Sequence, residues 1–487
     1  MLVAPLTLAL LAAPLSPEAA AAAPTPPMPQ VIAVDEAIFG PPEWTCAELL
    51  AAAAAERAAR TLPLPGPVEL PASTRTGPGP APRGAAEPAP DLPVSWADVL
   101  AGKLPGREPL APQPLEGSPA ALQQLRQALQ RPQAGLGLRI SVWGASHTAA
   151  DFFTGELRRA LQLRHGDGGH GFVWPAAMTN TERAHDLNLC STETWRSDFV
   201  GRTGGRADGW YGPGGGSLSS ADSSDFSYIQ TTRAGLGGAW RSAELLSLGL
   251  PGGGHVVLTV DDAAPRVIDT HSDQPRLLRH IIELPPGPHR LSLRPLGDGE
   301  VRLFGLSVHN DPRGVIVDAI GLRGRTARTW LSWDQQLLED GLATLAPDVL
   351  VLAYGTNEAA DTDLGVAQLQ EDLRRVLRKA RAAAPQAACV VIGPTDRGKT
   401  LSAKRRYAVY GRTALVAAAQ RELTLAEGCA YWDWQQAMGG PGAALTWRAA
   451  EPPLMSADLI HLSAEGYARS AALFLDALDA VAGARRP

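Results

Sequence analysis

Residues 348–358 read DVLVLAYGTNE, and this stretch decides the fold. An unbroken apolar run comes first, and a polar loop follows it at once. A strand that is apolar on both of its faces belongs to a parallel sheet covered by helices on both sides. Three more runs of this kind occur in the second half of the chain: GVIVDAI at 314–320, ACVVIGP at 388–394 and CAYWDW at 429–434.

Helices are predicted between these strands, near 329–345, 363–384, 403–427 and 463–483. Strands that alternate with helices predict an α/β domain with a parallel sheet. We expect the first strand of that sheet at 138–143 (LRISVW), with an amphipathic helix after it at 149–164. The domain then consists of residues 136–190 and 313–487.

The texture of the sequence changes between the first strand and the others. From about 191 to 312, short β-rich runs such as FSYIQTTR and HVVLTVDD are separated by Gly and Pro. This spacing is typical of an antiparallel sandwich. We therefore expect residues 191–312 to be a β-sandwich inserted into the α/β domain, not a tail.

The N-terminus has the pattern of an exported protein. An apolar run from Leu6 to Ala13 precedes the small residues 19–23, although no Lys or Arg comes before it. This pattern predicts a signal peptide over residues 1–23, with an Ala-rich leader or a mis-assigned start as the alternative. Residues 24–135 are expected to form an extension, helical at 46–60 and 117–131, with an exposed Pro-rich linker at 62–93.

Composition limits the partners. The chain has 487 residues, 45% of them apolar and 19% charged, which is enough to bury a sizeable core. A net charge of −6 without a large basic block argues against a nucleic-acid partner. The four cysteines contain no C-x-x-C pair, which excludes a zinc knuckle and a redox motif. An exported chain could bridge some of them, and the sequence does not decide which: Cys46, Cys190, Cys389 and Cys429.

Residues able to do chemistry follow three of the predicted strands. Ser146 lies between the first strand and a helix, Gly324 follows the strand at 314–320, and Asn357 follows the strand at 349–353. Carboxyl ends of parallel strands meet at one edge of a sheet, where open α/β folds place their sites. A serine there can be a nucleophile, while an amide and a backbone N–H can bind an oxyanion. The alternatives are a helix N-cap, a tight turn and an Asx-turn.

A fourth element, Asp-Leu-Ile-His at 458–461, precedes the last predicted helix. An Asp three residues before a His can hydrogen-bond the imidazole and fix its tautomer. The other ring nitrogen of His461 is then free to face the hydroxyl of Ser146. The full order of Ser, Gly, Asn, Asp and His is far more specific than any one of these motifs.

This order and spacing resemble the SGNH hydrolase superfamily, also called GDSL, which is defined by a serine, a loop glycine, an asparagine and a histidine. The resemblance implies a flavodoxin-like three-layer domain and a catalytic triad of Ser146, Asp458 and His461. It implies an oxyanion hole formed by the backbone N–H groups of Ser146 and Gly324 and the side chain of Asn357. It implies no metal and no organic cofactor.

A narrower resemblance comes from the stretch GASHTAADFFTGELRRALQLRHGDGGHGFVWP, residues 144–175. It is similar to bacterial peptidoglycan O-acetylesterases, which carry G-D-S-H at the nucleophile. Those enzymes also have a jelly-roll-like, carbohydrate-binding-like sandwich between the serine and glycine blocks. The resemblance implies a periplasmic or secreted, monomeric serine esterase without a membrane span after signal removal. It would remove O-acetyl groups from a cell-wall or extracellular polysaccharide, with peptidoglycan favoured.

One position departs from that family, since Ala145 stands where an Asp usually supports the nucleophile loop. His147 is expected to face the substrate or to brace the loop, and Trp174 and Trp195 are expected to contact sugar rings. Two other functions stay open. One is a polysaccharide O-acetyltransferase with the same triad, and the other is a glycan-binding protein without catalysis.

Overall fold

The computed structural model describes residues 112–483 except for 177, 179–183, 185, 204, 232–235 and 403–405, together with a few residues between 46 and 101. The chain divides into two compact units, 1–40 and 41–487, and all that follows concerns the second. The predicted signal peptide, most of the helix at 46–60 and nearly all of the linker at 62–93 lie outside the described residues.

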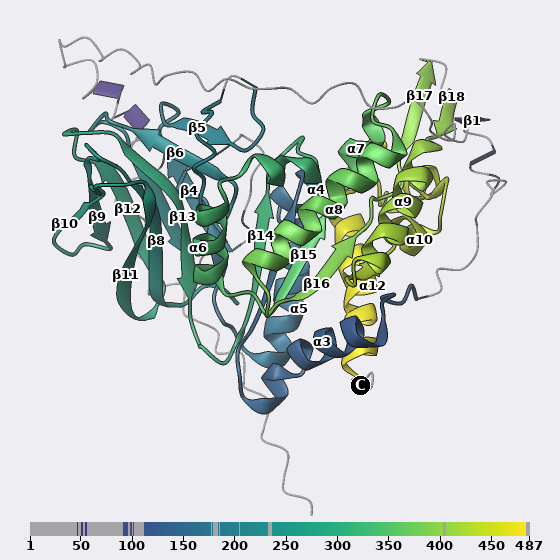
Figure 1. The fold of residues 1–487 in the computed structure, drawn as a ribbon, viewed down its shortest axis with the longest axis horizontal. Coiled ribbons are helices and arrows are strands. Elements are labelled where there is room, and N and C mark those ends of the chain that lie inside the picture. The colour runs from purple at the N-terminus through teal and green to yellow at the C-terminus, as the bar shows by residue number, and fades with distance from the viewer. Residues whose placement is uncertain are drawn as a thin grey trace, which may run out of the picture. The chain divides into compact units, whose positions relative to one another are not determined.

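Five described strands form a parallel sheet in the α/β domain (Figure 1). Their spatial order is β14-β2-β15-β16-β19, which becomes 2-1-3-4-5 when these strands are numbered along the chain. This is a doubly wound order. Each strand lies within a few residues of its predicted position: β2 (Leu138–Gly144), β14 (Val315–Gly321), β15 (Val349–Ala353), β16 (Ala388–Ile392) and β19 (Ala430–Trp432).

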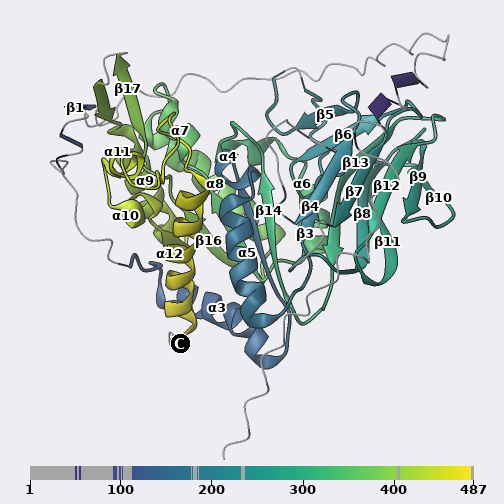
Figure 2. The ribbon, with the colours of Figure 1, turned by 180° about the vertical axis from the view of Figure 1, so that it is seen from behind.

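Helices cover both faces of this sheet, as Figures 1 and 2 show from opposite sides. On β15, Leu350 and Leu352 belong to one hydrophobic cluster, while Val349 and Val351 belong to another. Such alternation is expected of a strand buried on both faces. One cluster includes α6 (Gln335–Leu345), α8 (Val366–Ala383) and α9 (Arg412–Ala426), and the other α3 (Pro119–Leu129), α5 (Phe152–His165) and α12 (Ala464–Ala482).

Short helices lie between these elements, several of them next to the sheet's carboxyl edge. They are η2 (Arg131–Ala134), α4 (Ser146–Ala149), η3 (Ala327–Ser332), α7 (Thr356–Ala360), α10 (Trp434–Met438) and α11 (Ala443–Arg448). The helix predicted at 329–345 is therefore two pieces, because the chain is extended at Trp333 between η3 and α6.

The helix predicted at 403–427 starts later than expected. Strands β17 (Gly398–Ser402) and β18 (Arg406–Val409) form an antiparallel hairpin before α9 begins at Arg412. Strand β18 also pairs with β1 (Leu92–Ser95), from a part of the chain far away in sequence. That pairing overrides local helix propensity, and no local pattern could reveal it. Strand β1 includes the end of the predicted linker, where Pro93 is tolerated because an edge strand needs fewer donors.

Two antiparallel sheets lie between β2 and β14 in the chain, one ordered β10-β9-β12-β7-β4 and one ordered β11-β8-β13-β6-β5, with β3 also on β13. Buried leucines of both sheets share one cluster, so the sheets pack face to face. They start before the predicted boundary at 191. Their strands are β3 (Gly171–Val173), β4 (Leu187–Ser191), β5 (Arg196–Phe199), β6 (Gly216–Ser220), β7 (Ser227–Thr231), β8 (Trp240–Gly249), β9 (His255–Val260), β10 (Arg266–Asp269), β11 (Arg276–Gly287), β12 (Arg290–Pro295) and β13 (Val301–His309).

Three indoles join the sandwich to the α/β domain. Nε1 of Trp143, on β2, donates to the carbonyl of Pro213 (2.8 Å), and Nε1 of Trp333 donates to the carbonyl of Tyr211 (2.9 Å). Trp330 lies between the two, with ring centroids 5.6 Å from Trp143 and 5.3 Å from Trp333. The sandwich therefore shares a core with the α/β domain.

Asp318, on β14, forms a second junction and is fully buried. Its carboxylate binds the guanidinium of Arg139, on β2, through two hydrogen bonds of 2.8 Å and also accepts one from Ser141. It accepts the backbone N–H of Phe172, on β3 (2.7 Å), while Arg139 reaches Ser307, on β13 (2.9 Å). Burial works to raise the pKa of Asp318, but Arg139 and the hydrogen bonds outweigh it and hold the pKa below its usual range.

Replacing Asp318 with Asn should lower the free energy of unfolding by about 3–5 kcal/mol, because Arg139 then stays buried without a counter-charge. Urea denaturation at neutral pH measures this loss. The matched control is Asp311→Asn, at a more exposed carboxylate 3.4 Å from Arg313, and it should cost less than about 1 kcal/mol. Equal losses in the two variants would contradict the role given to Asp318.

Candidate active site

The register of the parallel sheet places the ends of β2, β14 and β15 side by side, so the loops that follow these strands start at the same edge of the sheet. Gly144, at the end of β2, pairs with Gly321 at the end of β14 and with Ala353 at the end of β15. Helix α4 starts at Ser146, directly after β2, and passes so close to β14 that a Cβ on Gly321 would overlap the backbone of Ala149. The loops expected to carry the chemistry are thus neighbours.

Ser146, His461 and Asp458 form one hydrogen-bonded chain. Nε2 of His461 lies 2.9 Å from Oγ of Ser146, and Nδ1 of the same ring lies 2.6 Å from Oδ2 of Asp458. About a third of the His461 side chain is exposed, so the pair is open to a ligand. In this arrangement an imidazole can take a proton from a hydroxyl while a carboxylate holds its other nitrogen.

The turn from Asp458 to His461 orients the carboxylate. Its Oδ1 accepts the backbone N–H groups of Ile460 and His461, each at 3.0 Å. Leu459, which follows Asp458 in this turn, has a φ of +58°, a strained conformation of the kind that clusters at active sites. Burial works to raise the pKa of Asp458, but the hydrogen bonds from His461 and Ile460 outweigh it and hold the pKa below its usual range.

Gly324 and Asn357 lie on two loops that are tied to each other. Gly324 has a φ of +74°, within a turn in which the N–H of Arg325 donates to the carbonyl of Leu322 (3.2 Å). That left-handed conformation favours glycine, although a Cβ there would meet no other atom within 4 Å. Nδ2 of Asn357 donates to the carbonyl of Arg325 (2.8 Å). An amide nitrogen has two donors, so a second N–H remains for a ligand.

Glu358 also connects the Gly324 loop to the Asn357 loop. Its buried carboxylate accepts the N–H of Ala327 (2.8 Å) and the N–H of Gly355 (2.9 Å), from the two loops in question. Burial raises the pKa of Glu358, and the two backbone donors oppose the rise. The residue after the asparagine is therefore a brace between the loops.

His147 is a brace as well, which is the second of the two roles expected for it, and the substrate-facing role is corrected because its ring is buried. The ring is buried, with Nδ1 2.8 Å from Oη of Tyr467 and Nε2 3.2 Å from Oγ1 of Thr395. Burial and, second, the neighbouring His461 lower the pKa of His147 to about 3. Sequence reasoning missed Thr395 and Tyr467. Only the position of Thr395 just after β16, at the sheet's carboxyl edge, could have pointed to it.

Ala145 shows how the nucleophile loop is held without the usual Asp. Its side chain is buried in the core and gives α4 no capping hydrogen bond. Its carbonyl accepts the N–H groups of Thr148 (3.1 Å) and Ala149 (3.0 Å), which closes the turn after Ser146. With His147 anchored on α12, the loop is supported from its other side.

Trp174 and Trp195 do not offer a surface to sugars, so their assignment as substrate contacts is wrong. Each indole is only 7% exposed and belongs to the core shared by the sandwich and the α/β domain. Nε1 of Trp195 donates to the carbonyl of Phe226 (3.0 Å), and Trp174 packs edge-on against Phe172. Aromatic residues fill sandwich cores as readily as they stack on sugars, and the sequence alone does not separate the two roles.

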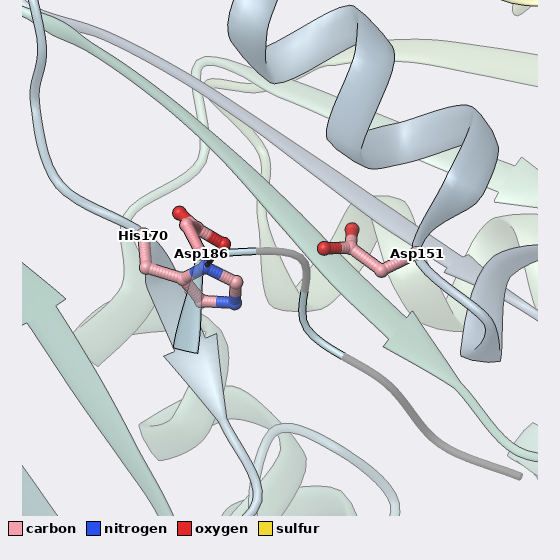
Figure 3. A group of neighbouring side chains, drawn as sticks. All are labelled: Asp151, His170 and Asp186. Carbon is pink, nitrogen blue, oxygen red and sulfur yellow. Dashed lines mark hydrogen bonds and ion pairs between the residues drawn. The ribbon is translucent and has the colours of Figure 1, made fainter. Parts of the chain in front are cut away.

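Asp151, His170 and Asp186 lie close together and have the donor types of a metal site (Figure 3). Nδ1 of His170 is 2.6 Å from Asp186. The guanidinium of Arg158 binds Asp151 through bonds of 2.8 and 3.0 Å and lies 3.4 Å from Asp186. The guanidinium of Arg158 therefore already supplies the positive charge beside these carboxylates, and we interpret the four side chains as a structural ion network.

Residues 299–469 match the model of the GDSL-like lipase/acylhydrolase family. The matched part contains Gly324, Asn357, Asp458 and His461, whereas Ser146 lies ahead of the inserted sheets and outside the match. No curated protein matches the chain in sequence. Among the described residues, no helix combines the length and apolar character needed to cross a membrane.

A solved structure of a peptidoglycan O-acetylesterase is similar to this chain with a TM-score of 0.62 and 25% identity, covering 76% of this chain and 98% of that one. Two family two carbohydrate esterases, from Clostridium thermocellum and Cellvibrio japonicus, match with TM-scores of 0.26 and 0.23 and identities of 11% and 14%. They cover 55% and 61% of this chain and 95% and 98% of their own. At such scores we draw nothing from them.

The low pKa of His147 predicts acid sensitivity. In the unfolded chain the imidazole of His147 has an ordinary pKa of about 6.5, whereas in the folded protein its pKa is about 3. The contribution of neutral His147 to the free energy of unfolding is therefore fully present above pH 6.5. It is lost as the pH falls towards 3, because the unfolded chain then binds a proton that the folded protein does not. Between pH 7 and 4.5, wild type should lose about 2–3 kcal/mol more unfolding free energy than His147→Gln, measured by urea denaturation.

The control for that experiment is His271→Gln, at a side chain that is 52% exposed, which should lose as much as wild type. Identical acid sensitivity of wild type and His147→Gln would contradict the buried, neutral state of this ring.

The family match and the peptidoglycan O-acetylesterase likeness agree on the class of the protein. The fold and the neighbouring loops at the sheet's carboxyl edge fit that class. Residues 299–469 are thus similar to GDSL-like, or SGNH, hydrolases, and the protein is a carboxylic ester hydrolase of the acetylesterase type.

Proposed function

We propose that this protein is an exported serine esterase that removes O-acetyl groups from a cell-wall polysaccharide, with peptidoglycan favoured. The observation that carries the proposal is the chain of contacts from Asp458 through His461 to Ser146, beside Gly324 and Asn357. The likeness to a peptidoglycan O-acetylesterase supports the choice of substrate.

The first half of the reaction acylates the serine. Nε2 of His461 accepts the proton of Ser146, and Oγ attacks the ester carbonyl. Asp458 holds Nδ1 and stabilises the imidazolium that forms. The imidazolium then donates its proton to the sugar oxygen as the carbon–oxygen bond breaks, so the deacetylated sugar leaves and the acetyl group remains on Oγ.

The second half returns the free enzyme. His461 takes a proton from water as the water oxygen attacks the acetyl-serine. The imidazolium then returns the proton to Oγ of Ser146 as the bond between Oγ and the acyl carbon breaks and acetate leaves. In both halves the oxyanion is bound by the backbone N–H groups of Ser146 and Gly324 and by the Asn357 amide. Loss of one such donor typically costs about 10²–10³ in turnover.

Two disulfides support export. Cys46 is bonded to Cys190, and Cys389 to Cys429, so all four cysteines whose pairing the sequence left open are paired. Disulfides form and persist in oxidising compartments such as the bacterial periplasm. Together with the signal peptide predicted at 1–23, they favour a periplasmic or secreted location.

Ser146→Ala should abolish acetate release from 4-nitrophenyl acetate, because it removes the attacking oxygen and keeps the fold. The matched control is Ser332→Ala, at the exposed serine that ends η3, which should retain full activity. A fluorophosphonate probe should label wild type and not Ser146→Ala. Absence of labelling and turnover in wild type would instead favour a glycan-binding protein without catalysis.

The polysaccharide is tested by measuring acetate release from O-acetylated peptidoglycan, acetylxylan and an aryl acetate side by side. We expect the largest kcat/KM on peptidoglycan, with acetate as the product. An oligosaccharide acceptor is added to a parallel reaction. If the acetyl group moves to that acceptor in preference to water, the protein is an O-acetyltransferase and the hydrolytic proposal is wrong.

A further inference from the structure

Two arginines meet beside the loop that carries Gly324. Arg325 belongs to that loop, and its Nη1 donates across to the carbonyl of Gly201 in the sandwich (2.9 Å). Its guanidinium carbon lies 5.0 Å from the ring centroid of Phe199, on β5. The guanidinium of Arg202, next to Gly201, lies 5.4 Å from the same ring. One aromatic ring therefore holds two cations, one from each part of the fold.

The positive charge at this place is not balanced by the protein. Within the part of the chain that the structure describes, no ion pair joins Arg202 or Arg325 to a carboxylate. Nε of Arg325 is buried without a hydrogen-bond partner. Burial and, second, repulsion by Arg202 lower the pKa of Arg325. The buried arginines Arg139 and Arg158 are different, since each binds an aspartate through two hydrogen bonds.

This charge lies on the loop that carries one of the proposed oxyanion donors. The carbonyl of Arg325 accepts the Asn357 amide, and its neighbour in sequence is Gly324. Arg323, on the same turn, is exposed and adds a third positive charge. An anion bound between Arg202 and Arg325 would therefore be held by the residue that follows Gly324 in the chain. Guanidinium groups present paired N–H donors that match the two oxygens of a carboxylate.

We propose that Arg202 and Arg325 form an anion subsite, built jointly by the sandwich and the α/β domain, that binds a carboxylate of the acetylated sugar substrate. The inference rests on the proposed esterase function and narrows its substrates to acetyl esters of acidic glycans. Both guanidinium groups lie near the ring of Phe199, where Arg202 donates to Ser197 and Arg325 donates to the carbonyl of Gly201.

The test compares two soluble acetyl esters that differ in one charge: O-acetylated N-acetylmuramic acid, which carries a carboxylate, and O-acetylated N-acetylglucosamine, which is neutral. In wild type, kcat/KM should be about tenfold higher for the acidic ester, and the preference should shrink with added salt because salt screens the charges. Arg202→Gln should lower the ratio of the two kcat/KM values about tenfold, mainly through KM. Arg202→Lys, which keeps the charge, should restore part of the ratio.

Arg202 is the informative position because its side chain does not hold the Gly324 loop, whereas Arg325→Gln would also loosen that loop and slow both esters. The matched control is Arg266→Gln, at an exposed arginine on β10 in the other sheet, which should leave the ratio unchanged. An unchanged ratio in Arg202→Gln overturns the subsite. Failure of wild type to hydrolyse either ester, with no serine labelling, overturns the esterase proposal instead.

Discussion

The buried pair of Asp318 and Arg139 is the constraint on which the rest of the structure depends. A carboxylate and a guanidinium can stay in an apolar core only if each satisfies the other, so they fix the relative position of the two strands that carry them. Those strands, β14 and β2, end at Gly321 and Gly144, which pair directly. The first leads into the Gly324 turn and the second into Ser146. A slip of these strands would separate the nucleophile from its proposed oxyanion donors.

Buried polar side chains then hold the loops that extend from this frame. Glu358 binds backbone N–H groups of two loops, and His147 is held by hydroxyl groups from two further segments. The carboxylate of Asp458 closes its own turn with one oxygen and reaches His461 with the other. Glu358 and His147 join segments that are remote in sequence, so the geometry at Ser146 comes from the packed fold and not from the nucleophile loop alone. This explains how the loop tolerates an alanine at position 145.

The sequence predicted those features that have a local pattern. Continuous apolar runs indicated all five strands of the parallel sheet, and the loops after them contain the side chains that the structure brings together. The features that it missed depend on distant partners. Strand β18 pairs with β1 although its local sequence predicts a helix, and β3 pairs with β13, which moves the start of the sandwich. Trp174 and Trp195 had the right chemistry for sugars, but composition does not reveal which face of a sheet is buried.

The shared core changes what the sandwich can do for the reaction. A binding module on a flexible linker raises the local concentration of a polymer, but it cannot distinguish one ester on that polymer from the next. Here Trp143, on the strand that leads to the nucleophile, hydrogen-bonds a sandwich carbonyl, and Arg325 reaches the sandwich from the Gly324 turn. The orientation of the sandwich relative to the reacting ester is thereby fixed. A group presented by the sandwich, such as Arg202, can then select substrates by the charge that lies next to the scissile bond.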